Sequence, residues 1–94
     1  MKISEIIWID AIENKLWVKH NLTIEEVEYV LKGNHRTRFI QRGTINDEHV
    51  YAITGRTAAG RYIIVFFILK HGGRILPISA RDMDHKERKR YGRT

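Results

Sequence analysis

The sequence predicts an α+β domain in which an N-terminal strand and two short helices pack on a four-stranded antiparallel meander, followed by a basic C-terminal helix. Three observations support this class. Apolar residues recur with a helical period between residues 10 and 33, they alternate or run together as in strands from residue 35 onward, and the chain after residue 83 is basic with almost no apolar face. The 94 residues, 43% of them hydrophobic, suit one domain over residues 1–94.

The first third of the chain begins with Lys2 to Ile9, an apolar-rich segment typical of a short strand. Asp10, with Glu13 three residues later, has the spacing of a reciprocal helix-capping signal. The helix that follows is predicted to end near His20, where Asn21 can adopt the left-handed conformation. Its buried stripe is expected to comprise Ile12, Leu16, Trp17 and Val18.

A second helix is predicted to start at Thr23, because Glu26 completes another capping signal, and to end before Gly33. Its inward residues are expected to be Ile24, Val27, Val30 and Leu31. Both tryptophans, Trp8 and Trp17, are interpreted as core residues.

Four extended segments then follow, at residues 35–42, 49–57, 61–70 and 74–81. The links at 57–60 and 71–73 are short enough for hairpins, which predicts the meander. The third segment is apolar on both faces, so the N-terminal helices should cover at least one of them. Pro77 cannot donate a ladder hydrogen bond, so the last strand is expected to lie at an edge or to be bulged near it.

The C-terminal helix is predicted to start at Asp84, with Glu87 three residues later, and Met83 and Tyr91 are its main anchors. Such a helix gains little from packing, so its charges are better explained by a ligand than by the fold. The alternative is a solvated terminal helix. The basic residues of the predicted C-terminal helix and its end are Lys86, Arg88, Lys89, Arg90 and Arg93.

The net charge of +6 is unevenly distributed along the chain. Residues 1–31 carry three basic and six acidic groups, a net of −3, so the remainder carries +9. This segregation predicts a polyanionic partner such as nucleic acid or an acidic protein.

The absence of cysteine excludes disulfides and thiolate chemistry and fits a reducing cytoplasmic setting. The start of the chain lacks the features of a signal peptide. The longest apolar run, from Tyr62 to Leu69, is too short to span a bilayer, so a protein without membrane contacts is expected.

The meander would gather several cationic side chains at one end of the sheet: His35, Arg36, Arg56, Arg61 and Arg81. Converging guanidiniums repel one another unless an anion neutralises them, which predicts a phosphate site. The alternative is a set of ordinary solvated strand-end arginines, since Arg42, Lys70, His71 and Arg74 collect at the opposite end by the same logic. The spacing of the five histidines and the lack of a Gly-rich phosphate loop predict neither a metal site nor a cofactor.

Several short motifs occur in a characteristic order. They are Trp8, Lys19-His20 before a T-x-E-E-V helix, Gly55-Arg56, Gly60-Arg61-Tyr62, Ile78-Ser79-Ala80-Arg81, and Glu87-Arg88 with Tyr91. Over roughly residues 8–91 this order resembles the BrnT family of type II toxin-antitoxin toxins. Two departures are Asn21, where the family often has glycine, and the short tail after the last helix.

The resemblance implies a RelE-like fold and a metal-independent ribonuclease that inhibits translation in the cytoplasm. It also implies a BrnA-like antitoxin with a ribbon-helix-helix domain, which would bind the toxin as a hetero-oligomer. Masking by charge would place an acidic or Leu-rich antitoxin segment over the Arg56/Arg81 end. The alternative function is a non-catalytic basic module that binds RNA or an acidic protein.

Metal-free RNA cleavage requires a base, an acid and cations around the phosphate. Arg56 and Arg81 are predicted to clamp the phosphate, with Arg61 as a third cation, and Arg36, Arg88 and Lys89 to bind RNA. Lys19 or His20 would transfer a proton, Glu87 would orient an arginine or act as the base, and Tyr91 would stack on a base or donate a proton. The structural alternatives are a solvated Lys19, a helix-capping His20 or Glu87, and an anchoring Tyr91.

Overall fold

The computed structural model describes residues 3–33, 36–43 and 48–93. Its elements follow one another as β1 (Glu5–Ile6), α1 (Asp10–His20), α2 (Ile24–Lys32), β2 (Arg36–Gln41), β3 (Val50–Arg56), β4 (Tyr62–Leu69), a 3₁₀ turn (His71–Gly73), β5 (Arg74–Asp82) and α3 (His85–Gly92). The described residues therefore form an α+β domain with three α-helices. Within the described ranges, no helix combines the length and apolar character needed to cross a bilayer.

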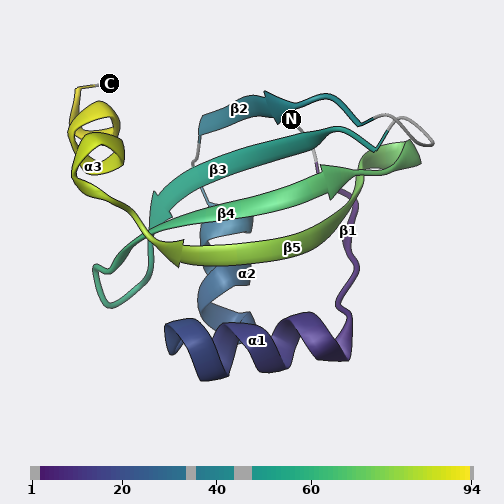
Figure 1. Cartoon of the computed structure of the whole chain (residues 1–94), viewed down its shortest axis with the longest axis horizontal. Coiled ribbons are helices and arrows are strands. Elements are labelled where there is room, and N and C mark those ends of the chain that lie inside the picture. The colour runs from purple at the N-terminus through teal and green to yellow at the C-terminus, as the bar shows by residue number, and fades with distance from the viewer. Residues whose placement is uncertain (1–2, 34–35, 44–47, 94) are drawn as a thin grey trace.

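The strands form one five-stranded sheet in the order β1-β5-β4-β3-β2. Strands β2 to β5 are antiparallel neighbours in chain order, and β1 adds a short parallel pair to β5. Helices α1 and α2 lie on one side of this sheet, and α3 stands at the end where β5 finishes (Figure 1). The opposite face of the sheet is therefore left to α3 and to solvent.

Two apolar clusters occupy the two faces of the sheet. The larger lies under α1 and α2 and includes Leu16, Val30, Ile53 and Phe67. The smaller lies on the α3 side and consists of Ala52, Ile64 and Met83, with Tyr62, Phe66 and Tyr91 packed against them. Because successive strand residues point to opposite faces, β4 contributes odd-numbered residues to the first cluster and even-numbered ones to the second.

Two of the three predicted helix starts are confirmed. Thr23 and Glu26, and likewise Asp84 and Glu87, form complete capping boxes with reciprocal side-chain and backbone hydrogen bonds. The prediction for Asp10 is wrong, because Ile9 is the N-cap of α1 and makes no side-chain cap hydrogen bond. Asp10 is instead the first helical residue, where its negative carboxylate interacts favourably with the positive end of the helix dipole.

The predicted ends of the two N-terminal helices are confirmed, because α1 ends at His20 and α2 ends before Gly33. Asn21 terminates α1 in the left-handed conformation, with φ of 53°. The predicted strand from Lys2 to Ile9 is reduced to Glu5–Ile6, and Lys2 lies outside the described residues.

The predicted buried stripe of α1 is only half correct. Leu16 is buried and Ile12 packs against the core, but Trp17 is 56% exposed and Val18 70% exposed. Each residue is turned about 100° from its predecessor around a helix, so Trp17 and Val18 rotate away from the face that Leu16 presents to the sheet. Trp8 is half-buried against the core, and its indole Nε1 donates a hydrogen bond to Glu28 Oε2 at 2.8 Å.

The predicted bulge at Pro77 is confirmed. The register of β4 and β5 shifts between Phe66, which pairs with Ser79, and Phe67, which pairs with Pro77. Strand β5 is an interior strand, but β1 pairs only with Arg74 and Ile75. The missing N–H of Pro77 therefore falls beyond the reach of β1.

Candidate nucleic-acid interface

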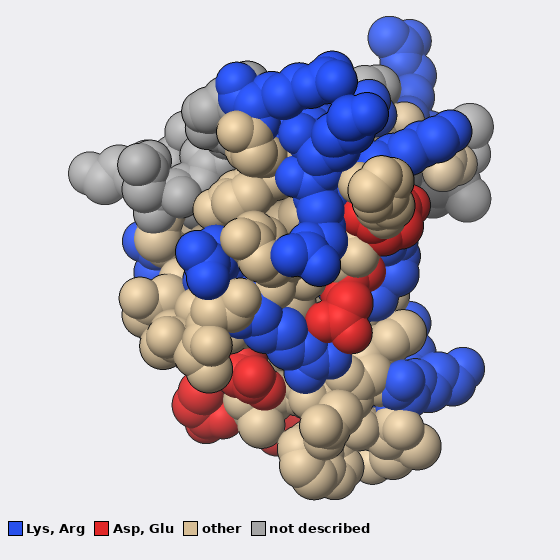
Figure 2. All heavy atoms as spheres, turned by 90° about the vertical axis from the view of Figure 1, so that its left-hand side faces the viewer, with Lys and Arg blue, Asp and Glu red and all other residues tan. Residues whose placement is uncertain are grey.

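The strand register places Arg56 and Arg81 on the same face of the sheet. Arg56 pairs with Tyr62, and Arg81 pairs with Ile64, two residues further along β4. Residues two apart on a strand point to the same side, and this is the side away from α1 and α2. Seen from the α3 end, Lys and Arg side chains spread over much of the surface (Figure 2).

The ring of Tyr62 carries two guanidinium groups. Arg56 Cζ lies 4.6 Å and Arg88 Cζ 4.3 Å from the ring centroid, both within the range of cation–π contacts. Tyr91 meets the same ring edge-on, with centroids 5.9 Å apart. We call Arg56, Tyr62, Arg88 and Tyr91 the Tyr62 cluster.

Among the described residues, no carboxylate neutralises the two arginines of the Tyr62 cluster. Neither Arg56 nor Arg88 forms an ion pair with a residue that the structure describes. The Arg56 side chain makes one long hydrogen bond, from Nε to the Gly60 carbonyl at 3.4 Å. Two uncompensated guanidiniums held on one ring favour a bound anion, and their planar donors suit a phosphate.

A hollow of about 680 Å³ opens beside the Tyr62 cluster, and we call it the α3 hollow. The helix contributes most of its wall, and β3 and β4 contribute the rest. Its lining residues are Arg56, Tyr62, His85, Arg88, Lys89, Tyr91 and Gly92. It brings together four of the predicted site residues, which are Arg56, Arg88, Lys89 and Tyr91.

Arg81 forms a bidentate pair with Glu87 at the start of α3. The Nη1–Oε1 and Nη2–Oε2 distances are 2.7 and 3.0 Å, and Nη1 also donates to the Asp82 carbonyl at 3.1 Å. The hydrogen bond from Arg81 holds the pKa of Glu87 below its usual value and raises the pKa of Arg81. Glu87 also caps α3 through the Asp84 amide, so the pair fixes α3 to β5.

Arg61 has the contacts of a structural bridge. Its Nε and Nη2 donate to the two carboxylate oxygens of Asp82 at 2.6 and 3.2 Å. Nη2 and Nη1 also donate to the carbonyls of His20 and Asn21 at 2.6 and 2.8 Å. A guanidinium has five N–H donors, so Arg61 keeps little capacity for a ligand while it ties the end of α1 to the sheet.

Lys19 and His20 lie at the C-terminal end of α1, next to this bridge. Lys19 is exposed and His20 is half-buried. The pKa of Asp82 is lowered mainly by its hydrogen bond from Arg61, with a smaller contribution from the nearby charge of His20. Within the described residues, neither Lys19 nor His20 lines the α3 hollow.

Two predicted cations fall outside this description. The backbone of Arg36 belongs to β2 and pairs with Thr54, but its side chain is outside the described residues, as is all of His35.

At the opposite end of the sheet, Lys70 pairs with Glu48, and Arg74 Nε donates to the His71 carbonyl at 3.3 Å. At that end, the carboxylate of Glu48 therefore neutralises Lys70.

Sequence reasoning did not select Tyr62 or His85 as site residues. Tyr62 was one letter of the Gly60-Arg61-Tyr62 motif, but its alternation with Ile64 and Phe66 along β4 indicates that all three face α3. His85 directly follows the predicted cap Asp84, so its position in the first turn of α3 could have been predicted from the sequence.

A protein-family model described as "Ribonuclease toxin, BrnT, of type II toxin-antitoxin system" matches residues 8–87. No individual curated protein matches the chain. The matched region extends from Trp8 to Glu87 and so includes β3, β4, β5 and the first turn of α3.

Proposed function

Because the family match covers residues 8–87 of 94, the chain belongs to the BrnT family of ribonuclease toxins of type II toxin-antitoxin systems, and we propose that it cleaves single-stranded RNA without a metal ion. The observation that carries this proposal is the pair of uncompensated arginines on Tyr62. They provide fixed positive charge where a phosphodiester gains negative charge during cleavage.

In the proposed reaction, a ribose 2′-hydroxyl attacks its own 3′-phosphate. A base removes the hydroxyl proton, the bond to the 5′-oxygen of the next nucleotide breaks, and an acid returns a proton to that oxygen. The products are a 2′,3′-cyclic phosphate and a 5′-hydroxyl, so no external reactant is needed. Arg56 and Arg88 bind the non-bridging oxygens, and Lys89 adds charge from the same wall of the α3 hollow.

Arg81 and Glu87 act in this proposal as positioning residues. Their bidentate pair holds α3, and with it Arg88 and Tyr91, over the sheet. Because Arg81 holds the pKa of Glu87 low, its carboxylate is a weak proton acceptor. Glu87 therefore serves to orient Arg81 rather than to act as the base.

Proton transfer is assigned to groups that line the α3 hollow. Tyr91 and His85 both do so, and a phenol and an imidazole can each donate or accept a proton. Lys19 and His20 do not line the α3 hollow, so we propose that they contribute by contacting RNA that flanks the cleaved phosphodiester. Arg61 itself supports the fold, and Arg36 remains a proposed RNA contact.

We propose that cleavage of cytoplasmic RNA inhibits translation and that the fold is RelE-like. A BrnA-like antitoxin with a ribbon-helix-helix domain is the proposed partner in a hetero-oligomer. Its inhibitory segment would be acidic or Leu-rich and would cover the Tyr62 cluster. Protection of Arg56 and Arg88 from arginine-specific modification in the complex supports this, whereas protection of Arg42 and Arg74 alone contradicts it.

The test of function uses purified protein freed from any partner, single-stranded RNA and an excess of EDTA. Wild-type protein is expected to cleave, and Arg56→Ala or Arg88→Ala to reduce the rate about 100-fold or more, as removal of one charge-stabilising donor does. Arg81→Ala is also expected to lose activity, because α3 is no longer held. Arg74→Ala, at the opposite end of the sheet, is the matched control and should cleave normally. Tight binding of RNA that stays intact would instead support the non-catalytic module.

A further inference from the structure

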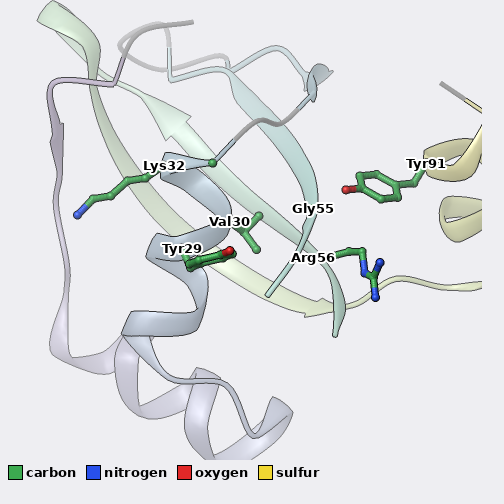
Figure 3. A pocket seen from close by; sticks show the side chains of 7 residues that line it. Tyr29, Val30, Lys32, Gly55, Arg56 and Tyr91 are labelled. Atoms are coloured by element: carbon green, nitrogen blue, oxygen red, sulfur yellow. The ribbon is translucent and has the colours of Figure 1, made fainter. Parts of the chain in front are cut away.

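A second hollow lies on the other side of Arg56, between α2, β3 and α3. Its volume is about 480 Å³, within the range of small-molecule sites. We call it the α2 hollow, and its lining residues are Tyr29, Val30, Lys32, Gly33, Gly55, Arg56 and Tyr91. Figure 3 shows Tyr91 reaching from α3 toward β3, with Tyr29 on α2 across the space.

The floor of the α2 hollow depends on Gly55. A Cβ atom at this position would lie 2.9 Å from Val30 Cγ1, closer than side chains approach in folded proteins. Glycine therefore lets α2 pack against β3 and leaves the strand without a side chain on the Val30 side. This close approach brings Tyr29, the residue before Val30, into the lining of the hollow.

The lining of the α2 hollow includes two aromatic side chains, Tyr29 and Tyr91, and two cationic ones, Lys32 and Arg56. Tyr29 is 56% exposed, although a tyrosine can bury most of its ring. Lys32 contributes to the lining, but its side chain extends away from Arg56 in Figure 3 and its ammonium lies 3.6 Å from Glu28. The lining thus combines the rings of Tyr29 and Tyr91, on opposite sides of the space, with the positive charge of Arg56 (Figure 3).

The α2 and α3 hollows share Arg56 and Tyr91. A phosphate bound by Arg56 on the α3 side would therefore have an aromatic site within the same wall. In single-stranded RNA each phosphate joins two sugars, and each sugar carries a base. Unstacked bases are commonly recognised by stacking on aromatic side chains. The two adjoining hollows therefore offer a cationic part and an aromatic part, as a nucleotide has an anionic phosphate and an aromatic base.

We propose that the α2 hollow is a nucleobase subsite in which a base next to the cleaved phosphodiester stacks on Tyr29. This inference rests on the proposed ribonuclease function, because it places the substrate's phosphate at Arg56. It adds Tyr29 as a residue that determines which nucleotide is held, and its ligand is a base of single-stranded RNA.

The test measures the affinity of short 2′-fluoro RNAs, which lack the attacking hydroxyl and stay uncut, by fluorescence anisotropy. One set contains a single abasic residue, moved along the chain. Tyr29→Ala is expected to raise Kd about tenfold for the intact oligonucleotide, since one base stacked on an aromatic ring is lost. Tyr29→Phe should retain wild-type affinity. At one abasic position, Tyr29→Ala should have no further effect, because base and ring are already apart.

Trp17→Ala is the matched control, because Trp17 is also 56% exposed and lies on α1 in a hollow with Glu13 and Glu25. It should bind every oligonucleotide as wild type does. The subsite is refuted if Tyr29→Ala binds intact RNA normally, as it would if Tyr29 contacted only the antitoxin. It is also refuted if Tyr29→Ala loses the same affinity whichever position is abasic. Cleavage is measured in parallel on 2′-hydroxyl RNA of the same sequence. Normal binding by Tyr29→Ala, with wild-type protein that cleaves this RNA, would overturn the subsite alone. The expected loss of binding, with wild-type protein that leaves this RNA intact, would overturn the ribonuclease function alone.

Discussion

Replacement of Arg61 by alanine distinguishes a structural role for this residue from a role in RNA binding. The side chain is 26% exposed and donates to the Asp82 carboxylate and to two carbonyl groups at the end of α1. Its removal leaves the carbonyls of His20 and Asn21 without this donor and releases the end of α1 from the sheet. We therefore expect a loss of stability rather than a specific loss of RNA affinity.

The magnitude follows from the contacts that are lost. Asp82 is 62% exposed, so its ion pair contributes no more than about 1 kcal/mol. The two hydrogen bonds from the charged Arg61 side chain to the carbonyls of His20 and Asn21 contribute more, and their combined loss costs about 1.5–3 kcal/mol. The sum is about 2–4 kcal/mol, which lowers Tm by about 10–25 °C in a domain of this size.

The assay is urea and thermal unfolding followed by circular dichroism, with RNA cleavage measured well below Tm. Arg61→Lys keeps the charge but cannot bridge three acceptors in one plane, so its stability should lie between wild type and Arg61→Ala. Asp82→Asn should lose no more than about 1 kcal/mol. An Arg61→Ala protein that unfolds like wild type but no longer cleaves RNA would refute the structural role and support the phosphate contact.

Three further variants test the fold around the site. The pKa of Glu87 is lowered in the folded state, so its carboxylate stabilises the fold above the ordinary pKa of 4.5, and this stabilisation is lost as the pH falls through the folded-state pKa. Wild type should therefore lose stability in acid. Glu87→Gln should be less stable than wild type at neutral pH, and its stability should depend less on pH, as measured by urea unfolding across this range. Thr23→Ala removes a capping box and should cost about 1 kcal/mol in unfolding free energy without changing the cleavage rate. Gly55→Ala forces a Cβ against Val30 and should cost about 1–3 kcal/mol by thermal unfolding; unchanged stability would show that α2 can move away from β3.

Local sequence signals predicted most of the elements. The capping signals at Thr23 and Asp84 and the left-handed Asn21 depend on residues within one turn, so they could be read directly. The failures at Trp17 and Val18 have a different origin. Their apolar character was visible, but the face that α1 presents to the sheet depends on how the helix packs, and the sheet contacts Leu16 rather than its two successors.

The site was predictable in kind but not in its pairings. The sequence indicated that Arg56, Arg61 and Arg81 gather at one end of a meander. It did not indicate that Asp82 and Glu87 would neutralise two of them, because each partner depends on the register of β5 and on the start of α3. The same register sets Arg56 opposite Tyr62, and α3 then adds Arg88 to that ring.

The most direct test of the central claim identifies the ends of the RNA fragments. In the proposed mechanism, the Tyr62 cluster stabilises a phosphodiester attacked by the neighbouring 2′-hydroxyl. Mass spectrometry of fragments produced in EDTA should find 2′,3′-cyclic phosphate and 5′-hydroxyl ends, and replacement of the 2′-hydroxyl by hydrogen at the cleaved linkage should abolish the cut there. Fragments with 3′-hydroxyl and 5′-phosphate ends, or cleavage that persists at the 2′-deoxy linkage, would contradict it.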